Sequence, residues 1–329
     1  MVQKVWDRPE IWRVIVELPK NPLRELNCYV IRDGDRSLII DTGFHTPVCH
    51  EDLWAGLEEL NPDLSKAALF LTHLHADHTG LVWDFVEKGV PVYMSRRDYE
   101  LSLTAESRRG LIELQGDRFL REGFPEEEMG KQRDGNHARA YAPAPGFPYC
   151  PMEDGDAVPC GSLTVQAILT PGHTPGHMVL YLPEEQLLFS GDHILFDITP
   201  NIAVWEDDDP SLENYISSLE MTKKLKVRQT FPAHREVAGD LYSRVDALID
   251  HHGWRLNEIF GAVKNNPGST AFEIAGHITW SARGLGWEKF PTNQKWFATA
   301  ETLAHLDYLT SRGQIVRKTE GNLRRYYAA

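Results

Sequence analysis

The sequence predicts an α/β protein with a smaller domain at its C-terminal end. Two observations lead to this prediction. Over the first 250 residues, short apolar runs with strand patterning alternate with helical patterns, and several of those runs end in histidine or aspartate. Over residues 251–329, helical patterns interrupted by glycine and proline precede two short strand-like runs.

Length and composition agree with a globular protein of two units. The chain has 329 residues, of which 42% are hydrophobic and 25% charged. We expect one domain over residues 1–250 and another over residues 251–329. Since no apolar run reaches the roughly 18 residues of a membrane span and the first ten residues have no signal-peptide core, we expect a cytoplasmic protein without membrane contact. Four scattered cysteines favour reduced thiols.

Charge is distributed unevenly between the two units. Residues 251–329 contain 10 Lys and Arg against 6 Asp and Glu, a net charge of +4. The whole chain carries −14, so the first 250 residues carry −18. An acidic body of this kind opposes general binding of nucleic acid.

The N-terminal part predicts strands at residues 11–18, 27–32 and 37–41, followed by a helix at residues 50–60. An Asp-Gly-Asp turn joins the second and third strands as a hairpin. The third strand ends at Asp41, followed by Thr and Gly. Such a sequence is either a simple turn or a polar support for a neighbouring site.

The most informative stretch lies between a strand and a helix. Residues 67–71 predict a buried strand, and residues 79–86 predict a turn and an amphipathic helix. Open α/β sheets place ligand sites at such strand ends. Imidazoles together with a carboxylate suit zinc, or a similar divalent metal, better than calcium or magnesium. The loop between the two elements carries four such side chains: His73, His75, Asp77 and His78.

Residues 95–159 predict an insertion of helix and loop between two core strands. Its first half has a helical pattern, and its second half is rich in proline and glycine. A solvated helix face is the favoured interpretation of its arginines, and a site for an acidic substrate is the alternative. The arginines concerned are Arg108, Arg109, Arg118 and Arg121.

Three later strand ends carry further candidate ligands. A strand at residues 163–169 leads to His173, a strand at residues 186–189 leads to Asp192, and a last strand end carries His234. One polar residue at a strand end is common, but the joint occurrence in this order is specific. The remaining elements expected in this part are strands at residues 90–94 and 178–182 and a helix at residues 211–225.

The C-terminal unit predicts a winged helix. Helical patterns cover residues 241–261 and 269–275, and a third helix runs through residues 298–309. A hairpin of residues 314–317 and 323–327 then forms the wing. Its basic residues indicate either contact with nucleic acid or, as the favoured interpretation, a packing or homodimerisation module. They are Arg317, Lys318, Arg324 and Arg325.

This series of motifs resembles that of the metallo-β-lactamase superfamily, and the C-terminal unit resembles the winged-helix domain of one branch of lactamase-like hydrolases. The resemblance implies an αβ/βα sandwich and two divalent metal ions, zinc being expected. It implies that Asp41 lies beneath the metal loop and orients it. It also implies two ligand sets joined by a bridging carboxylate: His73, His75 and His173 for the first ion, Asp77, His78 and His234 for the second, and Asp192 for both.

The resemblance further implies a hydrolase that attacks its substrate with a hydroxide shared by the two ions, with Asp77 and Asp192 as the catalytic carboxylates. The first expectation for the substrate is a small acyl compound, such as a thioester, as in glyoxalase II-like members. An endoribonuclease and a winged-helix regulator that binds nucleic acid are the alternatives. We expect structural roles for His177 and His193, which lie beside the ligand loops.

Overall fold

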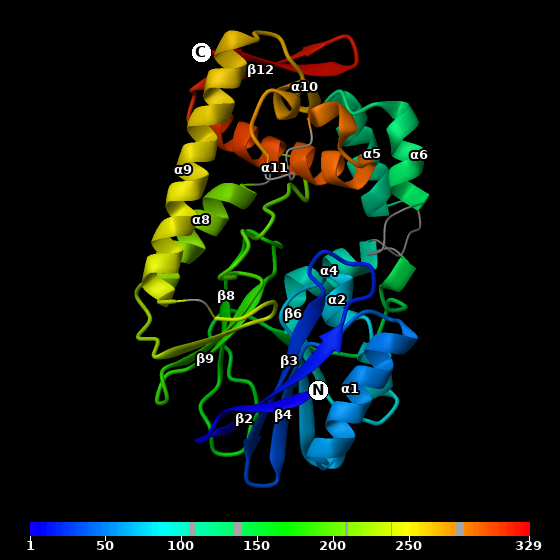
Figure 1. The fold of residues 1–329 in the computed structure, drawn as a ribbon, viewed down its shortest axis with the longest axis vertical. Helices are drawn as coiled ribbons and strands as arrows, with labels where there is room; N and C mark the ends of the chain where they lie inside the picture. The colour runs from blue at the N-terminus through cyan, green and yellow to red at the C-terminus, as the bar shows by residue number, and fades with distance from the viewer. Residues whose placement is uncertain (105–109, 135–139, 208–209, 238, 281–285) are drawn as a thin grey trace.

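The computed structural model describes residues 1–104, 110–134, 140–207, 210–237, 239–280 and 286–329. The two sheets and their helices occupy the lower part of Figure 1, and the helices and hairpin of the C-terminal part occupy the upper part. Helix α9 (Leu241–Asn265) runs along one side from the lower part to the upper part. The two termini lie far apart in this view.

Two sheets form the body. The first has the order β1-β2-β3-β4-β5-β6-β7, and the second has the order β11-β10-β9-β8. The strands of the first sheet are β1 Val2–Trp6, β2 Glu10–Glu17, β3 Glu25–Asp33, β4 Arg36–Ile40, β5 Ala67–Leu71, β6 Val92–Ser95 and β7 Cys150–Met152. Those of the second sheet are β8 Gln166–Leu169, β9 Met178–Leu182, β10 Leu187–Gly191 and β11 Gln229–Pro232.

The remaining elements surround these sheets. The helices before β7 are α1 Pro47–Leu60, η1 Leu64–Lys66, α2 Ala76–Thr79, α3 Val82–Val86, α4 Arg96–Thr104, α5 Gly110–Arg121 and α6 Glu126–Asp134. After β8 follow α8 Ser211–Thr222, α9, α10 Ala271–Gly276, η2 Trp287–Lys289, α11 Thr292–Ser311 and the hairpin β12 Ile315–Glu320 with β13 Leu323–Ala328.

Alternating side chains of the central strands pack into different layers, as the period of two in a strand requires. In β3, Tyr29 and Ile31 face the second sheet, whereas Cys28 and Val30 belong to the core shared with α1 and α3. In β9, Val179 instead joins the core shared with α8 and α9. Helices therefore cover the outer faces of two packed sheets, and the predicted αβ/βα sandwich is confirmed.

Strand direction gathers the polar loops at one edge of the sandwich. β4, β5, β6 and β7 are mutually parallel, so their carboxyl ends share an edge of the first sheet. In the second sheet, β8 and β10 are both antiparallel to β9, and β11 is parallel to β10. The carboxyl ends of β8, β10 and β11 therefore share an edge as well.

Most of the predicted elements are present, but two strands at the margins of the first sheet were not predicted. β1 carries little apolar patterning, and β7 lies in the proline-rich part of the insertion. Helix α1 begins three residues earlier than predicted, because Thr46 caps it by accepting the amide of Cys49 at 3.3 Å and Pro47 occupies its first turn.

The C-terminal helices pack as one unit with the body. Helix α9 contacts α8 of the body and also α10, α11 and β13 of the C-terminal part. The predicted domain boundary at residue 250 thus falls inside α9, and the division into residues 1–250 and 251–329 stays a prediction. Helix α10 has the predicted capping signal, a reciprocal pair of hydrogen bonds between Thr270 and Glu273.

The arginines of the insertion do not form a single solvated face. Arg118 is 4% exposed and pairs with Asp307 of α11, whereas Arg121 is exposed. Arg108 and Arg109 lie outside the described residues.

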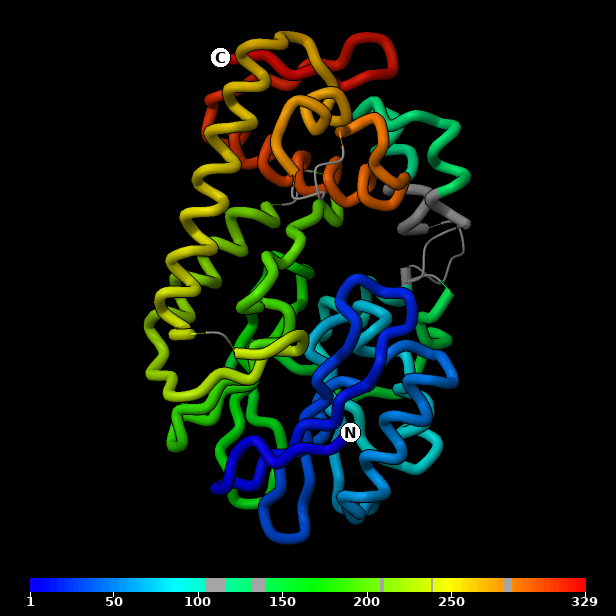
Figure 2. The backbone as a smooth tube through the Cα atoms, in the orientation of Figure 1, coloured from blue at the N-terminus to red at the C-terminus, as the bar shows by residue number. Residues whose placement is uncertain are grey.

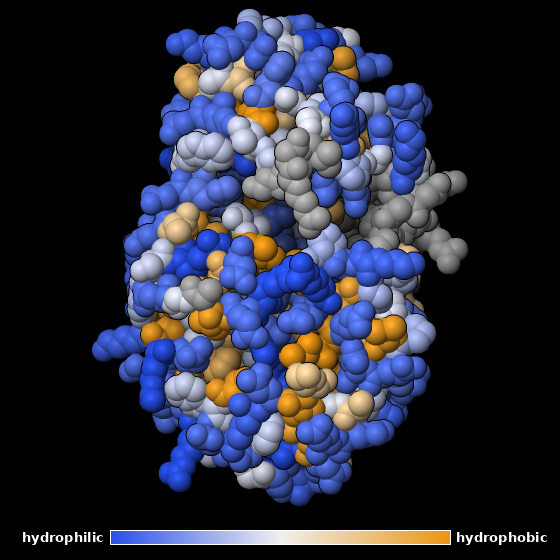
Figure 3. All heavy atoms as spheres, viewed as in Figure 1, coloured by the Kyte–Doolittle hydropathy of each residue, from blue (hydrophilic) through white to orange (hydrophobic). Residues whose placement is uncertain are grey.

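The face of the molecule in Figure 3 is mostly hydrophilic, with apolar side chains in separate small areas over its lower half. Across the described part of the chain, no helix combines the length and apolarity needed to cross a bilayer.

Candidate metal centre

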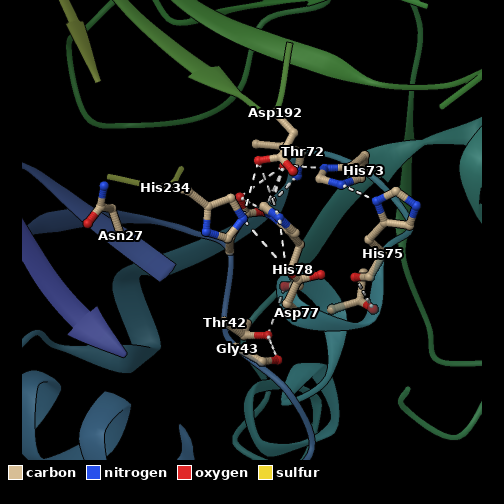
Figure 4. Close-up of polar contacts among 12 residues, drawn as sticks. Asn27, Thr42, Gly43, Thr72, His73, His75, Asp77, His78, Asp192 and His234 are labelled. Atoms are coloured by element: carbon tan, nitrogen blue, oxygen red, sulfur yellow. Dashed lines mark hydrogen bonds and ion pairs between the residues drawn. The ribbon is translucent and has the colours of Figure 1, made fainter. Parts of the chain in front are cut away.

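The seven residues predicted as metal ligands lie together at the edge where the two sheets present their carboxyl ends. Figure 4 shows Asp192 reaching in from β10, with His73 and His75 to one side, His234 to the other, and Asp77 and His78 below. Among the described residues, three overlapping sets have donor atoms within 4.8 Å of one another: His73, His75 and His173; His73, His78 and Asp192; Asp77, His78 and His234.

The first set is a triangle of imidazoles, here called the three-histidine group (His73, His75 and His173). His75 Nδ1 lies 2.9 Å from His73 Nε2 and 3.0 Å from His173 Nε2. Nitrogens from loops 98 residues apart therefore converge on one point. Three imidazoles with an open side have the donor character of a catalytic zinc site.

The second set, here called the mixed group (Asp77, His78 and His234), combines imidazole and carboxylate. Asp77 Oδ2 lies 3.5 Å from His234 Nε2 and 3.9 Å from His78 Nε2. Asp192 directs Oδ1 at this group, 3.4 Å from His234 Nε2, and Oδ2 at His173 Nε2, 3.5 Å away. Its carboxylate thus has one oxygen facing each group.

Hydrogen bonds on the opposite ring nitrogens leave the converging nitrogens as lone-pair donors. The Nδ1–H of His173 donates to Asn201 O at 2.9 Å, and the Nδ1–H of His234 donates to Glu25 O at 2.7 Å. His78 donates in the same way to Asp41 Oδ2 at 2.8 Å. For His173 and His234 this leaves Nε2 unprotonated, which is the tautomer a metal ligand requires, and an ion at His78 would take the place of a proton on Nε2.

Three buried atoms test whether this arrangement fits a cation. His78 Nε2, His234 Nε2 and Asp192 Oδ1 have no hydrogen-bond partner among the described residues. Leaving such atoms unsatisfied costs about 1–3 kcal/mol each, so native proteins rarely do so without another ligand. All three face the same point, where a bound cation would satisfy them and would replace any proton on His78 Nε2. The residues present therefore fit a divalent cation.

The local electrostatics agree with this fit. Burial lowers the pKa of His73, His75 and His173, so these imidazoles are neutral near pH 7. At His78, burial also acts to lower the pKa, but the carboxylates of Asp41, Asp77 and Asp192 outweigh it and raise the pKa to about 10. Three carboxylates around one imidazole are an environment that attracts positive charge.

Asp41 supports the metal loop from below, as predicted. Its carboxylate accepts the amide of Thr72 at 2.8 Å, the hydroxyl of Thr72 at 2.9 Å and the Nδ1–H of His78. The Thr72 oxygen in turn lies 3.0 Å from His73 Nδ1. One aspartate at the end of β4 thereby orients His78 directly and His73 through a hydroxyl.

Asp98, on the first turn of α4, was not predicted. Its buried carboxylate accepts the amide of Leu74 at 2.9 Å, the hydroxyl of Thr174 at 2.6 Å and the amide of Gly176 at 2.6 Å. A Cβ at Gly176 would lie 2.5 Å from the Asp98 amide, so only glycine allows this approach. Asp98 thus ties the His73 loop to the His173 loop. It follows the carboxyl end of β6, and this position was the available signal.

His177 and His193 have structural partners, in agreement with the prediction. His177 is fully buried, pairs with the Thr170 hydroxyl at 2.8 Å and accepts the backbone amide of Asp192 at 3.1 Å. It therefore holds the backbone of a predicted ligand without joining either group. His193 Nε2 lies 3.1 Å from the Thr222 hydroxyl.

Fold and site together point to one superfamily, and comparison with known proteins identifies it. The chain belongs to the metallo-beta-lactamase superfamily, which residues 22–234 match. Residues 285–329 match the C-terminal domain of metallo-beta-lactamase-like proteins.

Relatives of known name are moderately similar. The lactamase-like protein nscB of Aspergillus fumigatus is 29% identical over 258 residues, which are 76% of this chain and 61% of that protein. The beta-lactamase-like protein 2 homolog of Caenorhabditis elegans is 27% identical over 262 residues, covering 78% and 71%. An atrochrysone carboxyl ACP thioesterase of Cryptosporiopsis is 28% identical over 260 residues, covering 78% and 63%. The match with the first of these thus spans about three fifths of that relative's length.

Solved structures resemble the chain over its whole length. A beta-lactamase domain protein from Burkholderia ambifaria has a TM-score of 0.85 and 26% identity, covering 100% of this chain and 94% of that one. A metallo-beta-lactamase family protein from Thermus thermophilus has a TM-score of 0.81 and 28% identity, covering 97% and 98%. The arrangement of sandwich and C-terminal part is therefore shared with both.

Proposed function

We propose that this protein is a hydrolase that holds two divalent metal ions, zinc being expected, and acts on a small acyl substrate such as a thioester. The observation that carries the proposal is the convergence of donor atoms on two adjacent points, with three buried atoms at the second point having no hydrogen-bond partner among the described residues. The three-histidine group would hold one ion, the mixed group would hold the other, and Asp192 would bridge them.

Bound in these groups, two divalent ions would lower the pKa of a water molecule and polarise the carbonyl oxygen of a substrate. The protein contributes rigid placement of the donors through Asp41 and Asp98. Asp77 and Asp192 are the carboxylates at the centre, where they can hydrogen-bond the attacking water and take its proton. In the overall reaction the water oxygen bonds to the acyl carbon, the carbon–sulfur bond breaks, and the thiolate leaves and is protonated.

Three of the four cysteines are poorly suited to a covalent mechanism. Cys28, Cys49 and Cys160 are buried free thiols, and burial raises the pKa of each. A raised pKa suppresses the thiolate that attacks in such mechanisms. This favours water as the nucleophile.

Two observations favour an acyl substrate over RNA. Relatives matching 76–78% of this chain are named as acyl carrier protein thioesterases. The hairpin arginines are engaged within the molecule: Arg317 bonds Asp307 at 2.9 Å, Arg324 bonds Asp207 at 3.2 Å, and Arg325 donates to Gly268 O at 2.6 Å. Fewer free cations remain to neutralise phosphates, on which RNA affinity depends.

We further propose, from the order α10, α11, β12 and β13, that the C-terminal part is a winged helix that serves for packing. For the C-terminal part, homodimerisation is the second role to test. For the whole protein, the alternative functions are an endoribonuclease and a nucleic-acid-binding regulator.

The test is a substrate panel with the zinc-loaded protein, comparing acyl thioesters of graded length with single-stranded RNA. Asp192→Ala is the matched control. We expect the wild type to hydrolyse thioesters and Asp192→Ala to do so about 1,000-fold more slowly, which equals ~4 kcal/mol in the activation barrier. We expect the wild type and the variant to cleave RNA at the same background rate. RNA cleavage that depends on Asp192, without thioester hydrolysis, would replace this proposal with the endoribonuclease.

A further inference from the structure

Trp205 contacts the three-histidine group from the loop between β10 and α8. Its ring lies 5.6 Å from the ring of His75, and its Nε1–H donates to the backbone oxygen of His173 at 3.1 Å. Asn201 of the same loop accepts the Nδ1–H of His173. His75 is the one predicted ligand that is only partly buried, so Trp205 covers the most accessible member of the group.

The residues that follow Trp205 are held by buried and half-buried ion pairs, here called the arginine network (Arg118, Asp207, Asp307 and Arg324). Arg118 donates to the backbone oxygen of Glu206 and bonds Asp307 Oδ2 at 2.8 Å. Arg324 bonds Asp207 Oδ1 at 3.2 Å, and Arg118 lies 3.6 Å from the same oxygen. Two arginines thus hold the backbone and the side chain that come directly after Trp205.

The members of this network come from different parts of the chain. Arg118 lies on α5 of the insertion, Asp307 on α11, and Arg324 on β13. The loop segment before α8, green in Figures 1 and 2, rises from the sheets toward α11. The Arg118–Asp307 pair is almost fully buried, with side chains 4% and 8% exposed. Because a buried charge left without its partner is costly, such a pair resists displacement.

We propose that the C-terminal part, acting through the arginine network, holds Trp205 and its loop against His75 and His173. Trp205 is then a positioning residue of the metal centre. The inference rests on the proposed function in one respect, that these histidines bind a metal ion. The backbone oxygen of Asn201, on the Trp205 loop, accepts the Nδ1–H of His173, so displacement of that loop would withdraw this hydrogen bond. Such a bond fixes the tautomer of a ligand histidine and raises its basicity, and its loss costs roughly 10–100-fold in metal affinity.

The test measures the affinity of the protein for zinc and does not depend on its catalytic activity. Metal-free wild-type protein, Trp205→Ala, Trp205→Phe and Asp207→Asn are titrated with Zn²⁺ against a chromophoric chelator. We expect one of the two ions to bind roughly tenfold more weakly in Trp205→Ala and Asp207→Asn. Trp205→Phe keeps a ring on His75 but loses the hydrogen bond to His173, so its affinity falls between. Asp207 is half exposed, with 46% of its side chain accessible, so Asp207→Asn should fold normally.

Glu213→Gln is the matched control. Glu213 pairs with Arg312 at 3.1 Å, and both side chains are about half exposed. The pair also links the body to the C-terminal part, but neither residue belongs to the arginine network. This variant should bind both ions as the wild type does. Wild-type affinity in Trp205→Ala and Asp207→Asn would overturn the inference and leave the proposed function standing. No zinc binding by the wild type would overturn both, whereas normal binding without thioester hydrolysis would overturn the substrate assignment alone.

Discussion

Two clusters of histidines in this molecule are alike in being buried and differ in chemistry. At the metal centre, ring nitrogens from three loops converge beside the carboxylates of Asp77 and Asp192. Between α9 and α11, His252 and His305 are also buried, with His252 Nδ1 3.1 Å from His305 Nε2. His305 Nδ1 donates to Glu301 O, and the guanidinium of Arg255 acts electrostatically on both rings.

The difference shows what makes buried histidines a metal site. Both clusters are desolvated, and burial lowers the pKa of His252 and His305 as it does in the three-histidine group. At the second cluster the Arg255 guanidinium, which is paired with Glu258 and Glu301, acts to lower the pKa of both rings, and the rings bond each other. At the first, the neighbouring charges are negative and the lone pairs share one target. Convergence and charge, more than burial, define the site.

Asp192→Ala gives the largest expected contrast between the clusters. Since Asp192 faces both ligand groups, its loss should remove most of the two divalent ions expected per chain and lower activity by about 1,000-fold. His252→Gln is the matched change at the other cluster and should keep both ions. Elemental analysis of protein purified without chelators makes the comparison. Equal metal content in Asp192→Ala and the wild type would contradict it.

His173→Ala and His177→Ala should also differ in metal content and activity, although the two histidines lie on the same loop. His173 belongs to the three-histidine group, whereas His177 is bonded to Thr170 and the amide of Asp192. His173→Ala should lose one ion and activity by orders of magnitude, because several kcal/mol of transition-state stabilisation depend on a positioned metal. His177→Ala should keep its metal and lose much less activity. The reverse pattern would mean that the ligand on this loop is assigned wrongly.

Asp98→Asn asks whether every buried carboxylate near the centre is a ligand. Asp98 accepts three hydrogen bonds and faces the loops, so an amide in its place turns at least one accepting atom into a donor. We expect a loss of about 2 kcal/mol in the free energy of unfolding, measured in urea, with two ions retained. Asp33→Asn, at an exposed aspartate bonded to Ser162, should lose less. Metal loss comparable to that of Asp192→Ala would identify Asp98 as a ligand.

The smallest expected effect is a change with pH in the free energy of unfolding, caused by His305 of the second cluster. Burial lowers the pKa of His305 to about 3 from an ordinary value of 6.5. A lowered folded-state pKa contributes stability above pH 6.5 that is lost as the pH falls toward 3. Between pH 7.5 and 5.5 the wild type should therefore lose about 1.4 kcal/mol of unfolding free energy that His305→Gln does not lose. Parallel changes in the two proteins, followed by urea unfolding, would show that His305 titrates normally.

Sequence patterns predicted an α/β fold and singled out the seven candidate ligands, because strand ends and histidine spacing are local features. The sandwich and the grouping of the ligands came from the resemblance to the superfamily. The patterns missed Asp98, a single acidic residue without a motif, and Trp205, whose contact with His75 depends on a loop 130 residues away. They also favoured a solvated helix face for Arg118, and they placed Arg324 on a basic wing for packing, dimerisation or nucleic-acid contact without indicating its partner. Their partners, Asp307 and Asp207, lie 189 and 117 residues away in the chain, a pairing that no local pattern encodes.

Anomalous diffraction at the zinc absorption edge, from crystals grown with Zn²⁺, tests the central claim most directly. We predict two peaks. One should lie about 2.0–2.1 Å from His73 Nε2, His75 Nδ1 and His173 Nε2, and the other at similar distances from His78 Nε2, His234 Nε2 and Asp77, with Asp192 contacting both. No peak between these residues, or a peak at His252 and His305 instead, would contradict the assignment of this centre.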